Sequence, residues 1–343
     1  MKQKLREYFA AANGFTGFRS YFGETFYDKN TLAVFIVKGG PGTGKSSLMK
    51  RVLKDFLQKG YACDAIYCSS DPASLDGVII GGRVAILDGT APHEMDTRLP
   101  GALDEIINLG EGWNSDFLKK ERFKIEEINK IKKQNYNSAY KYLSFSGNIH
   151  DFKIKLLKKI FAYDECERLI SRLLEALAPE RKSNKSILIS AFSKHGLTRR
   201  DLSGFEIKNC FSINGTYGEE EIFFEALSKR LASDYSYIKI PSPLSDEITE
   251  GVYFEEEKIM FISNYNEGEI INASEFLQRG VDAEIEFLDR IEKMHLEKSK
   301  DFFKEASDAH FKLEDIYKNA MNFSKNEEIY EILSQKLMKI LSY

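Results

Sequence analysis

A glycine-rich turn at residues 39–46 carries the residue types in this chain that are best suited to chemistry on a phosphate. Its sequence, GGPGTGKS, fits G-x-x-x-x-G-K-[ST], where glycines let backbone N–H groups point inward with no Cβ in the way. Lys45 can reach the β- and γ-phosphates of a nucleoside triphosphate, and the Ser46 hydroxyl can bind Mg²⁺. The expected phosphate-binding residues are Gly39, Gly40, Pro41, Gly42, Thr43, Gly44, Lys45, Ser46 and Ser47. The alternative is a strand-to-helix turn with an incidental Lys-Ser pair.

The metal ion would need a second anchor, and Asp88 is the candidate. Residues 84–87 form an apolar run that predicts a buried strand, so Asp88 should lie at the carboxyl edge of the sheet, where open α/β sheets bind ligands. Ser46 and Asp88 are therefore the expected metal ligands. The sequence Asp88-Gly89 is also a common turn dipeptide, and that reading stays open.

Two further segments could take part in catalysis. Asp71 follows an expected strand at residues 62–68 and could act as a base or support the metal; it could instead form an Asx turn before Pro72. The segment TAPHEMDTRLPG contains His93, Asp96 and Arg98, where a loop that positions a nucleophile or a phosphoryl acceptor would lie. An exposed loop without a catalytic role is the alternative. Together with Lys45 and Asp88, Asp71 completes the expected catalytic set.

The neighbouring elements would position these residues. The run LAVFIV predicts a strand before the turn, and apolar residues at positions 48, 49, 52 and 53 predict a helix after it that ends near Gly60. Residues 78–80 and 84–87 flank a Gly-Gly-Arg turn and predict a hairpin that leads into Asp88. We expect residues 1–112 to form one nucleotide-binding α/β unit.

On these residues the chain resembles the P-loop NTPase superfamily, with Lys45, Ser46 and Asp88 in the matching roles. The run CSSDPASLDGVIIGGRVAILDGTAPHEMD is also similar to an uncharacterised bacterial family of tandem P-loop ATPases described as nucleotide-kinase-related. This resemblance covers most of the chain. It implies a three-layer α/β sandwich and ATP as ligand, and it leaves the phosphoryl acceptor open.

A second copy of the unit is expected at residues 181–273, at an offset of about 175 residues. Aligning FSINGTYGEEEIFFE with FIVKGGPGTGKSSLM places Lys45 on Glu221 and Ser46 on Ile222, and a later match places Asp88 on Ser263. Carboxylates at residues 219–221 would repel a triphosphate, so this copy should be a degenerate pseudo-site. Two unrelated α/β modules are the alternative. By charge alone, Arg199 or Arg200 could reach the first site as a catalytic arginine, although a solvated basic loop fits them as well.

Two long helical segments complete the expected organisation, at residues 113–180 and 274–343. Their apolar residues recur at spacings of three and four on charged helices, a pattern typical of helices that pair through a narrow seam. We expect each segment to be a helical hairpin that projects from its α/β unit, with the two hairpins packed together. A protein partner could bind these arms. The lysines of NKIKKQN could bind nucleic acid, and this alternative stays open. We do not expect such a partner, because glutamates are interleaved with these lysines.

The composition indicates an ordinary globular protein in the cytoplasm. The formal charge is −4, from 49 basic and 53 acidic residues, so no large field favours nucleic acid or a membrane. The four cysteines lack metal-ligand spacing, and no run of about 18 apolar residues suggests a membrane span. The sequence thus predicts an ATPase with ATP and Mg²⁺ as cofactors. A small-molecule or nucleotide kinase and a nucleotide-responsive binding module are the alternatives. The lack of a convincing N-K-x-D motif favours ATP over GTP.

Overall fold

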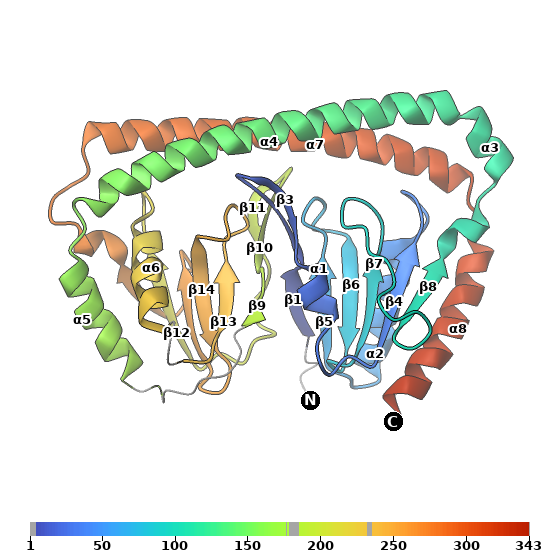
Figure 1. Cartoon of the computed structure of the whole chain (residues 1–343), viewed down its shortest axis with the longest axis horizontal. Helices are drawn as coiled ribbons and strands as arrows, with labels where there is room; N and C mark the ends of the chain where they lie inside the picture. The colour runs from blue at the N-terminus through green and yellow to red at the C-terminus, as the bar shows by residue number, and fades with distance from the viewer. Residues whose placement is uncertain (1–4, 176, 178–184, 232–234, 343) are drawn as a thin grey trace.

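Two six-stranded sheets lie side by side beneath a pair of long helices in the computed structural model (Figure 1). The structure describes residues 5–175, 177, 185–231 and 235–342. Both sheets mix parallel and antiparallel strands, so the expected α/β class is confirmed. The boundary expected between residues 180 and 181 lies outside the described residues. Among the described helices, none combines the length and apolar character needed to cross a membrane.

The first sheet contains the expected glycine-rich turn. Its strands, in spatial order, are β1 (Leu5–Phe9), β5 (Cys63–Tyr67), β6 (Leu75–Ile80), β7 (Val84–Asp88), β4 (Ala33–Lys38) and β8 (Asp104–Asn108). The central strand β4 pairs in parallel with both β7 and β8, and its apolar run is buried on both faces. Helix α2 (Lys45–Gln58) covers one face, while the short α1 (Phe22–Phe26) contributes Phe22 and Phe26 to the core on the other.

The second sheet has the same order of elements as the first. Its strands are β9 (Lys185–Ser186), β13 (Ile238–Pro241), β14 (Thr249–Phe254), β15 (Ile259–Ser263), β12 (Asn209–Asn214) and β16 (Glu269–Asn272). Helix α6 (Glu219–Leu231) follows β12 as α2 follows β4. The register of the antiparallel pair shifts at matching points, between Ile66 and Tyr67 in the first sheet and between Ile240 and Pro241 in the second.

A hairpin follows the first strand of each sheet, and the two hairpins join the sheets. The hairpin of β2 (Ala11–Gly14) and β3 (Gly17–Ser20) lies close to that of β10 (Ser190–Ser193) and β11 (Gly196–Arg199). The Phe9 N–H donates to the Leu188 carbonyl at 2.7 Å, and the Asn13 amide donates to the Phe192 carbonyl at 2.9 Å. These buried bonds hold the two sheets in one arrangement.

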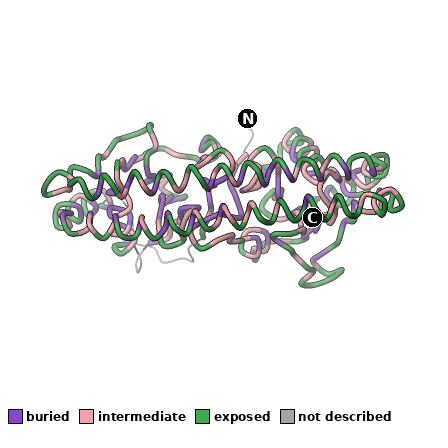
Figure 2. The backbone as a smooth tube through the Cα atoms, turned by 90° about the horizontal axis from the view of Figure 1, so that it is seen from above, coloured by how far each residue is buried: buried purple, intermediate pink, exposed green. Residues whose placement is uncertain are grey.

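The long helices α4 (Arg122–Lys158) and α7 (Ala283–Asn319) run antiparallel over both sheets, with buried residues between them (Figure 2). The short α3 (Ser115–Lys120) precedes α4. Each long helix has 37 residues, a length of about 55 Å, so it spans both units. The seam includes the apolar residues Ile128, Ala139, Leu143, Phe303, Ala309 and Leu313. Seam positions recur along the whole of each helix, which explains why no hairpin turn interrupts it.

The chain exchanges its final helices between the two units. Helix α4 starts after η1 (Leu109–Gly112) of the first unit and leads to α5 (Tyr163–Leu174), which packs on α6 of the second. Helix α7 starts after η2 (Ala273–Phe276) and leads to α8 (Ser324–Leu341), which packs on α2. The prediction that each helical segment is a hairpin projecting from its own unit is therefore wrong. Each segment crosses to the other unit, and its last helix packs there.

A buried charge network joins α4 to α7 and to the start of α6. The ring nitrogens of His150 lie 2.9 Å from Glu221 and 3.0 Å from Glu292. Lys153 pairs with Glu292 at 2.7 Å and with Asp289 at 3.0 Å. Burial alone would lower the pKa of His150, but Glu221 and Glu292 outweigh it and raise that pKa to about 10. At neutral pH His150 is therefore a cation, and Lys293 adds a further ion pair to the network through Asp289 at 2.6 Å.

Replacing His150 with Gln should lower the free energy of unfolding by about 3 kcal/mol near pH 6, because Glu221 and Glu292 lose the cation between them. The folded pKa of about 10 lies above the ordinary value of 6.5. The contribution of His150 is therefore complete below pH 6.5 and disappears as the pH rises through about 10. Urea unfolding at several pH values measures this difference, with His295→Gln on α7 as control. An equal difference at both pH extremes would contradict the charge assignment.

Candidate functional site

The glycine-rich turn wraps tightly around the start of α2. Gly44, the residue before the helix, has φ 91°, and Gly42 has φ 68°, both in the left-handed region that side chains disfavour. A Cβ on Gly39 would lie 2.6 Å from Thr43 Oγ1, which is too close. The Thr43 hydroxyl donates to the Gly40 carbonyl at 2.9 Å. The glycines are thus required by this backbone path.

The structure brings Lys45 and Asp88 together at the carboxyl ends of β4 and β7, with Ser46 next to Lys45 in the first turn of α2. The Lys45 amine donates to the Gly39 carbonyl at 2.8 Å and the Gly40 carbonyl at 2.9 Å, and it lies 3.6 Å from Asp88 Oδ2. The Ser46 hydroxyl accepts a bond from the Leu75 N–H at 3.0 Å. Register places Asp88 directly beside Val37, the penultimate residue of β4. Parallel pairing of the strands is what brings the carboxylate to the turn.

Asp88 also forms the turn that the alternative reading expected. Its Oδ1 accepts bonds from the Thr90 N–H at 2.9 Å and from the Thr90 hydroxyl at 2.6 Å. Its Oδ2 faces Lys45. The two readings of Asp88 are therefore compatible, since each uses a different oxygen.

Sequence reasoning missed Asp76, the second carboxylate of the site. Asp76 is 5% exposed, and its Oδ2 has no hydrogen-bond partner and lies 3.7 Å from His93 Nε2. One ligand atom each from Asp76, Asp88 and His93 lies within 4.8 Å of the others. The predicted hairpin could have indicated Asp76, because β6 and β7 are antiparallel and a residue at the start of β6 lies beside the end of β7.

Burial shifts the pKa values of both newly paired groups. Burial, and then the nearby Asp88 charge, raises the pKa of the Asp76 carboxyl well above its usual range. Burial also lowers the pKa of His93 to about 4, so its imidazole is neutral at neutral pH. The site thus combines a neutral imidazole with two carboxyl groups that disfavour each other's charge.

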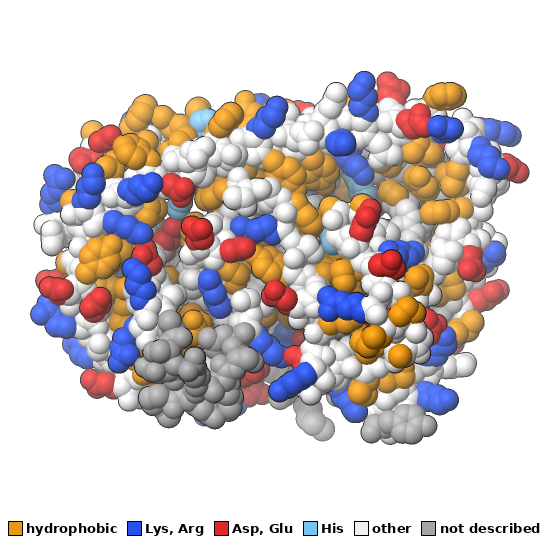
Figure 3. Space-filling view, viewed as in Figure 1, with side chains coloured by type: hydrophobic (Ala, Val, Ile, Leu, Met, Phe, Trp, Pro, Cys, Tyr) orange, Lys and Arg blue, Asp and Glu red, His pale blue; other side chains and the backbone are white. Residues whose placement is uncertain are grey.

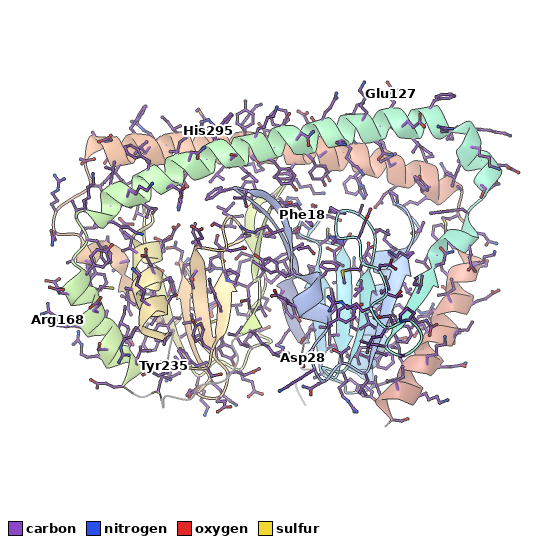
Figure 4. The ribbon with its side chains drawn as sticks, in the orientation of Figure 1. Phe18, Asp28, Glu127, Arg168, Tyr235 and His295 are labelled. Atoms are coloured by element: carbon purple, nitrogen blue, oxygen red, sulfur yellow. The ribbon has the colours of Figure 1, made fainter. Side chains whose placement is uncertain are left out.

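The loop that carries His93 is fixed from the sheet by Lys38, a residue that the sequence analysis did not single out. The Lys38 amine donates to the Gly89 carbonyl at 2.7 Å and to the Met95 carbonyl at 2.6 Å. The His93 ring stacks on Phe22 with a centroid distance of 4.2 Å and lies 6.0 Å from Phe18, which Figure 4 labels beneath the helix pair. These contacts turn His93 inward.

Two other residues of that loop, and Asp71, lie beside the cluster rather than in it. Asp96 is exposed, and the Arg98 guanidinium lies 3.8 Å from the centre of the Tyr27 ring. Asp71 Oδ2 accepts a bond from the Ser74 hydroxyl at 2.8 Å, and Asp71 Oδ1 lies 3.6 Å from Lys194. This local geometry agrees with the turn reading of Asp71, and its catalytic role stays a prediction.

The corresponding turn of the second unit contains its own carboxylate. Glu219 Oε2 accepts bonds from the N–H groups of Thr216 and Tyr217, each at 2.8 Å. Residues 215–218 connect β12 to α6, whereas residues 39–44 connect β4 to α2, so the second turn is shorter by two residues. The helix starts therefore match Lys45 with Glu219. The predicted match of Lys45 with Glu221 is therefore wrong by two residues. The predicted match of Asp88 with Ser263 agrees with the structure, because Ser263 ends β15 as Asp88 ends β7.

Arg199 and Arg200 both have partners away from Lys45. Arg199 donates to the Ser263 carbonyl at 2.9 Å and lies 4.0 Å from Glu250. Arg200 donates to the Pro72 carbonyl at 3.2 Å and stacks on the Tyr67 ring at 3.4 Å. Neither hypothesis for these arginines agrees with the structure. Both side chains are partly buried in these contacts, so they neither extend to Lys45 nor form a solvated basic loop.

The exchanged helices cover the outside of the glycine-rich turn. A Cβ on Gly40 would lie 3.3 Å from the rings of both Trp113 and Tyr317. A Cβ on Gly42 would lie 2.6 Å from the Glu314 carbonyl of α7. From α8, the Asn326 amide donates to the Thr43 carbonyl at 2.9 Å. The turn therefore contacts helices that originate in the second unit.

Comparison of the chain with protein-family models, with curated proteins and with solved structures gives no match.

Replacing Lys38 with Ala should loosen residues 89–96, because two charge-assisted hydrogen bonds are lost. Amide hydrogen exchange in this segment should rise about tenfold, as expected for a loss of about 1.4 kcal/mol. Lys29→Ala is the matched control, since Lys29 is exposed just before β4. Unchanged exchange in Lys38→Ala would show that Phe22 alone holds the loop.

Proposed function

We propose that the chain is an ATP-binding P-loop ATPase with one Mg-ATP site, on its first unit. The observation that carries this proposal is the pairing of Lys45 with Asp88 at a glycine-rich turn that starts α2, where Ser46 follows Lys45. The helix start adds its positive dipole end at the same place. Oriented N–H groups, an amine, a hydroxyl and a carboxylate form a set suited to a metal-bound triphosphate.

The residues present fit both ligands of this proposal. A Cβ on Gly39 would clash with the Thr43 hydroxyl, and the hydrogen bonds of the Lys45 amine go to carbonyls of the turn, which a phosphate can replace. The Ser46 hydroxyl and Asp88 would hold Mg²⁺. When bound, Mg²⁺ neutralises phosphate charge. Lys45 would add a second positive charge near the transferred phosphoryl group, and the turn would orient it, so catalysis rests mainly on positioning and charge.

We infer further that the two units arose by duplication of one P-loop unit. Support comes from the shared strand order, the matching register shifts and the equivalent hairpins. Two unrelated α/β modules would not be expected to share the strand order, the register shifts and the hairpins. The second unit would then be a pseudo-site, because Glu219 already accepts the N–H groups that a phosphate would need.

Nucleotide state would couple to the helical arms through the cover of the turn. Asn326, on α8, donates to the Thr43 carbonyl, and the ring of Tyr317, on α7, lies so close to Gly40 that a Cβ there would be 3.3 Å from it. Any change of the turn on binding ATP would therefore act on helices that also pack on the second unit. Hydrophobic side chains gather along the upper outline of the molecule (Figure 3). On the arms, Phe145 and Phe152 of α4 and Met294 of α7 are 52%, 47% and 61% exposed. A protein partner would bind there.

A kinase is the second candidate, and the His93 loop favours it. Residues 89–103 connect β7 to β8, whereas only residues 264–268 connect the equivalent strands of the second unit. An added loop beside the proposed γ-phosphate position could bind a phosphoryl acceptor other than water.

Replacing Lys45 with Ala should abolish ATP binding while the fold is retained, because the amine makes no contact that stabilises the core. We expect a loss in affinity of at least 100-fold, about 2.7 kcal/mol. Equilibrium binding and circular dichroism measure the two quantities. Lys50→Ala, an exposed lysine one turn later on α2, is the matched control. Equal ATP affinity in Lys45→Ala and wild type would overturn the proposal.

Release of phosphate from γ-labelled ATP in the same samples separates the two candidates. Lys45-dependent release without an acceptor supports an ATPase, whereas Lys45-dependent binding without release supports a kinase. One bound ATP per chain is expected, and two would refute the pseudo-site.

Replacing Asn326 with Ala should weaken ATP binding about fivefold, because Thr43 loses a hydrogen bond worth about 1 kcal/mol that orders the turn. Titration calorimetry measures the affinity, with the exposed Gln335→Ala on the same helix as control. Unchanged affinity would show that α8 does not sense the turn.

A further inference from the structure

Asp76 and Asp88 form a pair of carboxyl groups at the adjoining ends of β6 and β7, in which Asp76 is buried and Asp88 is partly buried. Asp76 is 5% exposed and its Oδ2 has no hydrogen-bond partner. Lys45 lies 3.6 Å from Asp88, but its hydrogen bonds go to carbonyls of the turn. Two carboxylates this close repel each other unless a cation lies between them. The arrangement points to a ligand of positive charge.

The second unit shows what occupies the equivalent place there. Glu250 precedes Gly251 on β14 as Asp76 precedes Gly77 on β6, and Ser263 ends β15 as Asp88 ends β7. Arg199 lies against both positions, since it lies 4.0 Å from Glu250 Oε2 and donates to the Ser263 carbonyl at 2.9 Å. In the second unit, a protein cation therefore fills the space between the strand ends.

Among the described residues of the first unit, no arginine lies at the place of Arg199, and the cation beside Asp88 is Lys45 of the glycine-rich turn, at 3.6 Å. Arg199 ends β11 opposite Ser190, and the residue that ends β3 opposite Ala11 is Ser20, which is exposed. The neighbouring Arg19 donates to the Ser242 and Pro243 carbonyls and pairs with Asp246 at 2.9 Å. The first unit instead has His93, on a loop longer than its counterpart.

We propose that Asp76, Asp88 and His93 form a binding site for a divalent transition-metal ion of the Mn²⁺ class, which binds without nucleotide. The metal would replace the Arg199 guanidinium of the second unit. It shares Asp88 with the proposed Mg-ATP site but does not need the glycine-rich turn. Carboxylate oxygens suit Mn²⁺, and an imidazole nitrogen favours a transition metal over Mg²⁺, which prefers oxygen ligands.

The metal would clamp three segments. Asp76 is the second residue of β6, Asp88 ends β7 and His93 lies on the loop from β7 to β8. A bound ion would therefore fix the His93 loop against the sheet, together with the two bonds from Lys38. Its presence would set the position of the loop beside the triphosphate site.

Mn²⁺ binding to the full chain without nucleotide tests this proposal, followed by the electron paramagnetic resonance signal of free Mn²⁺. We expect one site per chain, weakened at least tenfold by Asp76→Asn and by His93→Gln. Glu250→Gln, which changes the equivalent carboxylate of the second unit, should not affect it. Circular dichroism of each variant checks that the fold is retained. If wild type binds no Mn²⁺ at 1 mM metal, or if both variants bind it as wild type does, the proposal is overturned.

Two further arms separate this site from the nucleotide site. Lys45→Ala should retain or strengthen Mn²⁺ binding, because it removes a positive charge 3.6 Å from Asp88. Loss of Mn²⁺ binding in Lys45→Ala would show that the metal belongs only to the glycine-rich turn and would overturn the proposal. A tenfold excess of Mg²⁺ should not displace Mn²⁺, whereas Zn²⁺ should; displacement by Mg²⁺ at this excess would overturn the assignment to a transition metal.

Discussion

The antiparallel packing of α4 on α7 is the contact on which the rest of the structure depends. Each helix begins in one unit and ends above the other, so the pair is the route by which α5 and α8 reach the sheets that they cover. Tyr317 and Asn326 cover the glycine-rich turn only because α7 crosses from the second unit to the first. Weakening the seam would therefore affect both sheets and the turn together.

The two units meet the same electrostatic demand in different ways. Each places acidic or polar groups, and the turn that starts a helix, at the ends of the central strands. In the second unit, Glu219 accepts from the N–H groups and Arg199 lies between the strand ends, so both charges belong to the protein. Among the described residues of the first unit, no carboxylate accepts from the turn as Glu219 does, and the cation near the strand ends is Lys45, which hydrogen-bonds to carbonyls of the turn. That difference is consistent with a ligand-binding half and a structural half.

Much of the first unit could be predicted because its signals are local. The turn, the buried strand before it and Asp88 lie within a short stretch whose spacing matches a sequence pattern of phosphate-binding turns. Asp76 was missed because its role depends on an antiparallel neighbour that turns it toward Asp88. The match of Lys45 with Glu221 failed because the second turn is shorter, and an alignment without a gap cannot see that.

The sequence by itself determined the periodic patterns: two strand-rich segments, a glycine-rich turn and two long helices with narrow apolar seams. These depend on backbone geometry and on residue spacing, which are local properties. Only the tertiary structure decided that the helices cross between units, that His93 faces Asp76, and that Arg199 stays within its own unit. The physical reason is that burial and charge pairing between distant segments depend on where both segments lie, and no spacing along the chain encodes that.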